Sequence, residues 1–144
     1  MSDPNNLPGT GRWSYRSFKN DPNLSHDLQK DGNVYCPEFG QGTLDIITWP
    51  NGTLTGTIGG DGWQLDLKGS FQNGSPATLW FRGTGNVGGA PWVYDYLGYA
   101  VPNIPEGNLQ VPALVGSVTR AIGHPGGEEV GLVASFFAVY QELL

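Results

Sequence analysis

Residues 91–102 hold the densest group of side chains in this 144-residue chain that could bind or transform a ligand. The stretch carries one carboxylate and four aromatic rings: Trp92, Tyr94, Asp95, Tyr96 and Tyr99. In a strand, alternate side chains face opposite sides, which separates Asp95 from the row of Trp92, Tyr94 and Tyr96. An inward Asp95 would be an acid in apolar surroundings, able to donate a proton or to hold a ligand. An outward Asp95 would pair with Arg82 across a hairpin.

A second candidate for proton transfer is His124, which we expect in a loop at the mouth of the last hairpin. The candidate walls and anchors of a ligand cavity are aromatic and polar side chains of the central strands: Trp63, Trp80, Arg82, Trp92, Tyr94, Tyr96 and Tyr99. No metal site is predicted, because the other histidine, His26, belongs to a distant polar loop and a ligand set cannot be placed. No cofactor is expected, since no glycine-rich run links a strand to a helix.

Composition excludes several classes of partner. The net charge is −6 with only seven lysines and arginines, which leaves no basic surface for nucleic acid or for an anionic membrane. No apolar run is long enough to span a bilayer as a helix. Residues 1–9 lack the basic start and apolar core of a secretory signal, and Cys36 has no partner for a disulfide. These features predict a cytoplasmic protein.

The chain reads as one domain, residues 1–144, made of short strands separated by turns. Residues 1–10 are expected as a flexible lead and residues 19–41 as a long loop. Eight stretches favour strands: residues 12–18, 42–49, 53–58, 63–71, 77–84, 91–102, 113–122 and 130–140. Between the second and third, Asn51 and Gly52 predict a tight primed hairpin turn, because both residues tolerate positive φ angles.

About eight sequential antiparallel strands predict an all-β fold, a single up-and-down barrel in which the last strand closes on the first. The alternative is a β-sandwich, which the run of consecutive tight hairpins disfavours. A C-terminal helix over residues 128–144 is a further alternative, disfavoured by Gly131 and by the β-branched and aromatic content of that segment.

The tripeptide Gly11-Arg12-Trp13 resembles the Gly-x-Trp signature on the first strand of lipocalins, avidins and related calycin barrels, and allene-oxide-cyclase-like barrels have a similar strand count. The resemblance implies that Trp13 closes one end of the barrel and that an arginine from a late strand lies over its ring. Arg120 is the matching residue by position. It also implies a barrel that holds a small apolar or aromatic molecule.

Three functions follow from these expectations. The first is a barrel that binds a mostly apolar or aromatic small molecule in its interior. The second is a cofactor-independent cyclase or isomerase that uses the same cavity, with Asp95, a tyrosine or His124 moving a proton. The third is a non-catalytic interaction or assembly module, in which an exposed aromatic row meets a second copy of the chain. The sequence does not decide whether the protein is an enzyme.

Overall fold

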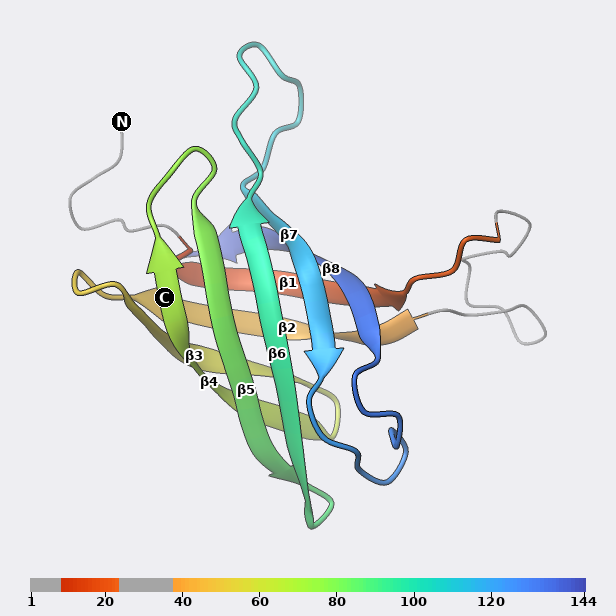
Figure 1. The fold of residues 1–144 in the computed structure, drawn as a ribbon. Helices are drawn as coiled ribbons and strands as arrows, with labels where there is room; N and C mark the ends of the chain where they lie inside the picture. The colour runs from red at the N-terminus through yellow and green to blue at the C-terminus, as the bar shows by residue number, and fades with distance from the viewer. Residues whose placement is uncertain (1–8, 24–37) are drawn as a thin grey trace.

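A computed structural model describes residues 9–23 and 38–144 of the chain. These residues form eight β-strands and no helix (Figure 1). The strands are β1 (Gly11–Lys19), β2 (Glu38–Thr48), β3 (Thr53–Gly60), β4 (Trp63–Gln72), β5 (Thr78–Val87), β6 (Ala90–Ala100), β7 (Ala113–Arg120) and β8 (Val133–Glu142). Because the described residues contain no helix at all, they offer no helical segment of the length and apolarity that a bilayer crossing requires.

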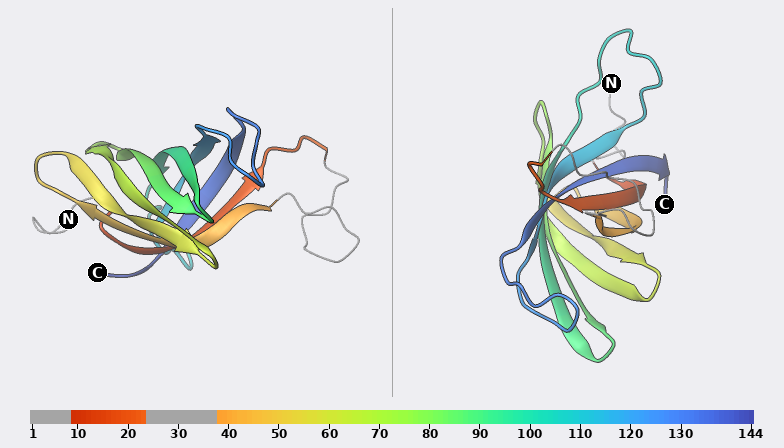
Figure 2. Two further views of the ribbon diagram at one scale, coloured as in Figure 1. Left: turned by 90° about the horizontal axis from the view of Figure 1, so that it is seen from below. Right: turned by 90° about the vertical axis from the view of Figure 1, so that its right-hand side faces the viewer.

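Each strand pairs antiparallel with the next, and β8 pairs with β1, so the sheet closes into an up-and-down barrel (Figures 1 and 2). The predicted all-β barrel of about eight strands is therefore confirmed, whereas the sandwich and the C-terminal helix are not observed. Closure leaves no strand with an unpaired edge, which removes the usual route to edge-to-edge aggregation.

Alternation along each strand determines which side chains fill the barrel. On β6, Tyr94 and Tyr96 are buried and face inward, while Asp95 between them faces outward. The interior contains a single continuous apolar cluster, to which every strand contributes: Trp13, Tyr15, Leu44, Ile46, Leu54, Ile58, Leu65, Leu67, Leu79, Phe81, Tyr94, Tyr96, Leu114, Val118, Ala134, Phe136 and Ala138.

The hairpin between β2 and β3 has a different turn from the one predicted. Only Gly52 has a positive φ, of 89°, and its backbone N–H donates to the carbonyl of Trp49. Pro50 explains the difference, because its ring fixes φ near −65° and favours an ordinary turn followed by a left-handed glycine. The primed geometry, with two successive positive φ angles, occurs instead at Gly88 and Gly89 between β5 and β6.

Strand β2 begins at Glu38, four residues before the predicted start at Gly42. Its extra residues pair with the end of β1 through an irregularity in which Ser17 faces Gly40 and Phe18 faces Glu38. Phe39 is thereby left without a partner, as in a β-bulge, which re-aims the bulged side chain. Cys36 and His26, discussed above, lie outside the described residues.

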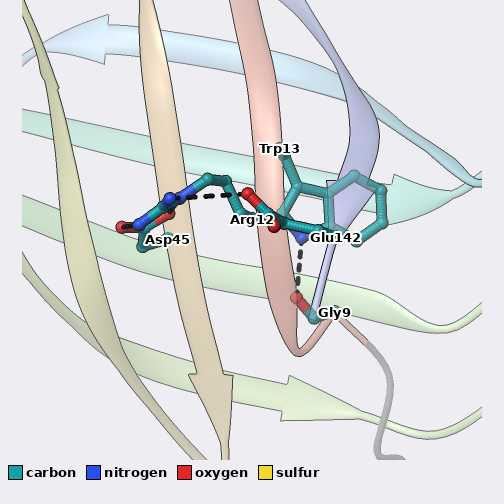
Figure 3. Close-up of polar contacts among 5 residues, drawn as sticks. All are labelled: Gly9, Arg12, Trp13, Asp45 and Glu142. Carbon is teal, nitrogen blue, oxygen red and sulfur yellow. Dashed lines mark hydrogen bonds and ion pairs between the residues drawn. The ribbon is translucent and has the colours of Figure 1, made fainter. Parts of the chain in front are cut away.

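The barrel has two ends, here called the Trp13 end, where β1 begins, and the Arg120 end, where β7 ends. At the first, the indole of Trp13 donates to the carbonyl of Gly9 at 2.9 Å (Figure 3), and the ring of Tyr140 packs edge-on at 5.4 Å. On the outside, Arg12 forms ion pairs with Asp45 and Glu142.

The expected stacking of Arg120 over Trp13 is wrong. Strands β1 and β7 both pair antiparallel with β8, so they run parallel to each other. The start of β1 and the end of β7 therefore lie at opposite ends of the barrel. The guanidinium of Arg120 instead lies over the rings of Phe39, at 5.1 Å, and Tyr94, at 5.8 Å.

Candidate functional site

A cavity of about 240 Å³ opens inside the barrel at the Arg120 end. Its walls come mainly from β1, β2, β4 and β6 and consist of Tyr15, Ser17, Phe39, Gly40, Trp63, Leu65, Trp92, Tyr94, Tyr96 and Val118. One water needs only about 10–15 Å³ by the comparable measure, so this space exceeds an ordinary packing defect. The barrel thus contains an open space toward the Arg120 end.

Gly40 is one reason for the hollow. It lies in the cavity wall with no side chain, and a Cβ placed there would meet only the Ser17 hydroxyl oxygen, at 3.5 Å. Its φ angle is not in the left-handed region, so a larger residue could occupy this position without backbone strain. The absence of a side chain at this position keeps the cavity open.

Two buried tyrosines supply hydroxyl groups to the cavity wall. Tyr15 and Tyr96 are each about 3 % exposed. Burial raises the pKa of Tyr96 well above its ordinary value, and it also raises the pKa of Tyr15, partly opposed there by the hydroxyl of Ser17. Both phenols therefore remain protonated and neutral at physiological pH.

A chain of hydrogen bonds lies directly behind the cavity wall. The Nε of Arg120 donates to the hydroxyl oxygen of Tyr94 at 3.0 Å, and that hydroxyl lies 2.6 Å from Nε2 of His124. The other ring nitrogen of His124, Nδ1, lies 2.9 Å from the carbonyl of Pro125, which can only accept. Nδ1 therefore carries a proton, and in the neutral ring Nε2 accepts the proton of the Tyr94 hydroxyl.

The sequence His124-Pro125-Gly126-Gly127 builds the turn that holds this histidine. His124 and Gly127 exchange two backbone hydrogen bonds, and Gly126 has a φ of 85°, the positive angle of a turn with proline before it. Gly127 has to be small, since a Cβ there would lie 2.8 Å from the Arg120 guanidinium and 2.6 Å from the His124 ring. The turn thus holds the imidazole within hydrogen-bond distance of the Tyr94 hydroxyl.

The imidazole is also fixed by aromatic contacts. Its ring stacks on Trp92 at 4.1 Å and 18°, and Trp92 in turn lies 6.5 Å from Trp63. His124 is only 7 % exposed, although it belongs to a loop. The loop position was predicted, whereas the burial of the side chain against Trp92 was not.

Arg120 is a buried cation without a carboxylate partner among the described residues. It is 8 % exposed, and its contacts are the Tyr94 hydroxyl, the carbonyl of Glu129 at 3.4 Å, and the two aromatic rings above. A buried charge without a counter-ion is unfavourable unless other groups stabilise it. The positive charge at this end of the barrel therefore favours groups of partial negative charge nearby.

Four of the residues proposed for the site lie on the outer face: Trp80, Arg82, Asp95 and Tyr99. This corrects their assignment to the cavity, although an outward Asp95 paired with Arg82 was one of the two arrangements expected from the sequence. Asp95 forms a two-pronged ion pair with Arg82 at 2.7 and 2.9 Å, and this hydrogen bonding raises the pKa of Arg82. Trp80 and Tyr99 are 52 % and 43 % exposed. The physical reason is the two-residue period, which cannot place both Tyr96 and its neighbour Asp95 inside.

The other proposed residues lie at the cavity or behind it. Trp63, Trp92, Tyr94 and Tyr96 line the cavity, while His124 and Arg120 contact Tyr94. Six lining residues were not predicted from the sequence: Tyr15, Ser17, Phe39, Gly40, Leu65 and Val118. Tyr15, Ser17, Leu65 and Val118 follow the alternation of their strands, so the pattern contained them. Phe39 depends on the bulge in β2, which no simple alternation signals.

No three histidine, cysteine or acidic side chains come together as a metal site within residues 9–23 and 38–144. Comparison of the chain with protein-family models, with curated proteins and with solved structures gave no match. No family or function is therefore transferred to this chain from another protein.

Proposed function

We propose that the protein binds a small, mostly apolar molecule with an aromatic ring in the cavity at the Arg120 end. The observation that carries this proposal is the hollow itself, about 240 Å³, which is lined largely by aromatic side chains inside the barrel. Rings favour stacked and edge-on contacts with other rings, and ligand pockets are typically apolar with a few polar groups that fix orientation.

The cavity volume limits the size of the molecule. An apolar cavity of about 150 Å³ accommodates benzene, and drug-sized ligands occupy pockets of about 300–1,000 Å³. The space here lies between these values. The expected ligand therefore has one aromatic ring with a short substituent.

Filling the cavity tests this proposal. We expect acetophenone to shift backbone amide resonances of the lining residues in a two-dimensional NMR titration of the wild-type protein. Gly40→Leu places a side chain in the cavity and should abolish these shifts. Gln41→Leu adds the same side chain at an exposed neighbouring position and should leave them unchanged. Equal binding by all three proteins would contradict the proposal.

The hydrogen-bond chain of Arg120, Tyr94 and His124 favours a second candidate function, a cofactor-independent isomerase that transfers protons. In this scheme the oxygen of Tyr94 takes a proton from carbon next to a carbonyl group, while the hydroxyl proton of Tyr94 moves to Nε2 of His124. If a carbon–carbon double bond adjoins that carbon, the substrate becomes a dienolate, and the Arg120 cation stabilises the developing negative charge. Return of the proton to the far carbon of the dienolate then moves the double bond and completes the isomerisation.

Exchange of the methyl protons of acetophenone in D₂O, followed by NMR, tests the second candidate without knowledge of the natural substrate. The wild-type protein should accelerate the exchange above the rate in buffer. Tyr94→Phe should abolish the acceleration, and so should His124→Gln, which can accept a hydrogen bond but cannot take up a proton. If the wild-type protein does not exceed the buffer rate, the isomerase hypothesis is wrong and the binding proposal is unaffected.

A further inference from the structure

The hydroxyl group of Tyr96 has no hydrogen-bond partner among the residues that the structure describes. Within the same residues, every side-chain oxygen or nitrogen that is wholly shielded from solvent does have one. The oxygen of Tyr96 is therefore not wholly shielded, although the residue is only 3 % exposed. Since Tyr96 lines the cavity, its hydroxyl reaches the cavity space.

The ring of Tyr96 is held in place by its neighbours. It stacks on Phe81 at 4.9 Å and 15°, and it meets the edges of Tyr15 and Phe136, each at 6.1 Å. A ring clamped on several sides cannot turn its hydroxyl toward another partner without loss of these contacts. The donor is thus fixed in position before any ligand arrives.

The protonation of the phenols determines what they can bind. Because burial raises the pKa of both Tyr96 and Tyr15, each presents an O–H group rather than a phenolate. An O–H group with a vacant donor position requires an acceptor. Water could fill this role, but a buried donor facing an aromatic cavity fits an acceptor that is attached to an aromatic ring.

We infer that the ligand carries a neutral carbonyl oxygen that accepts a hydrogen bond from the Tyr96 hydroxyl, with Tyr15 and Ser17 as adjacent hydroxyl groups of the same wall. The inference rests on the proposed binding function and narrows it to aryl ketones, aryl aldehydes and related compounds. A carboxylate is disfavoured, because the same burial that keeps the phenols neutral also penalises an anion.

Three compounds of nearly equal shape test the inference: acetophenone, α-methylstyrene, in which a CH₂ group replaces the carbonyl oxygen, and benzoate. Their dissociation constants for the full chain are measured by NMR titration. The wild-type protein should bind acetophenone about 2- to 13-fold more tightly than α-methylstyrene, which is the usual range for one hydrogen bond. Tyr96→Phe should remove this preference, and Tyr99→Phe, which deletes an exposed hydroxyl on the outer face, should retain it.

The possible outcomes separate the inference from the binding proposal. If acetophenone and α-methylstyrene bind the wild-type protein equally well, the cavity binds ligands but the inferred carbonyl contact is wrong. Tighter binding of benzoate than of acetophenone overturns the choice of a neutral acceptor. If none of the three compounds shifts a resonance of the cavity, the binding function itself fails. A preference for acetophenone that survives in Tyr96→Phe assigns the contact to another residue and contradicts the inference.

Discussion

Replacement of Tyr96 by phenylalanine should make the protein more stable while it weakens ligand recognition. The substitution removes one hydroxyl and leaves the stacked ring in place. A buried polar group without a partner costs about 1–3 kcal/mol. Since the oxygen of Tyr96 reaches the cavity, where water offsets part of this cost, we expect a gain near the lower end, about 1 kcal/mol.

Urea unfolding measures this gain directly. With a slope of about 2 kcal/mol/M, typical of small domains, a gain of about 1 kcal/mol raises the midpoint by about 0.5 M. The slope should not change, because the surface exposed on unfolding is nearly the same.

Tyr94→Phe is the matched comparison, because it deletes the same hydroxyl two residues away on the same strand face. There the hydroxyl joins Arg120 to His124, so its loss leaves a buried guanidinium and an imidazole without their partner. We expect a loss of about 3 kcal/mol and a midpoint lower by about 1.5 M. Destabilisation by Tyr96→Phe as large as that by Tyr94→Phe would mean that the Tyr96 hydroxyl does have a partner in the folded protein.

Four further predictions follow from the same structure. Asp95→Asn should leave both the acetophenone affinity and the rate of proton exchange at wild-type values, because Asp95 pairs with Arg82 on the outer face. A loss of either would mean that Asp95 takes part in binding or in proton transfer. The folded-state pKa values of Tyr15 and Tyr96 are raised above the ordinary value of 10.0. Below pH 10 both phenols are protonated in the folded and the unfolded protein, so they should not change the free energy of unfolding. Above pH 10 they ionise first in the unfolded chain, so the stability measured by urea unfolding should fall. The double variant with phenylalanine at both positions should show a smaller fall, and an identical fall would contradict this assignment. Gly127→Ala should displace His124 and reduce the proton exchange of acetophenone, with the outcome visible in the imidazole NMR signals; unchanged signals would mean that the turn does not position the ring. Leu97 and Trp80 are paired across β5 and β6 and are 56 % and 52 % exposed on the outer face, so sedimentation should detect self-association of the wild-type chain that Leu97→Glu abolishes. A strictly monomeric wild-type protein would exclude such an interface.

The barrel could be predicted because its strands alternate and its turns contain glycine, asparagine and proline. On β4, apolar Leu65 and Leu67 alternate with polar Gln64 and Asp66, and the structure buries the first pair alone. The turn at Gly52 was placed correctly but assigned the wrong type, since Pro50 before it sets the backbone angle. The local sequence pattern therefore predicts the strands and the positions of the turns, whereas the type of each turn depends on the neighbouring residues.

The candidate site could be predicted only in part. The alternation of β6 already separated Asp95 from Tyr94 and Tyr96, but the pattern alone did not say which face was inside. In the structure Asp95 lies outside, where it forms an ion pair with Arg82. Burial of its carboxylate in the apolar interior would cost more free energy. The resemblance to other barrels placed Arg120 over Trp13, but the antiparallel order of the strands already puts the start of β1 and the end of β7 at opposite ends of the barrel.

Phe39 illustrates a different limit. Its side chain packs edge-on against Tyr94 at 5.8 Å and lies beneath the Arg120 cation at 5.1 Å, so it is central to the site. It reaches this place only because the pairing of β1 with β2 shifts by one residue near Ser17. A bulge depends on the partner strand and leaves no periodic signal in the sequence of β2 itself.

The most direct test of the binding site is a crystal structure of the protein soaked with 4-bromoacetophenone, in which anomalous scattering locates the bromine. The proposal predicts one bromine inside the barrel at the Arg120 end, with the ketone oxygen within hydrogen-bond distance of the Tyr96 hydroxyl. Bromine found only on the outer surface, with the cavity filled by water or by rearranged side chains, would contradict it.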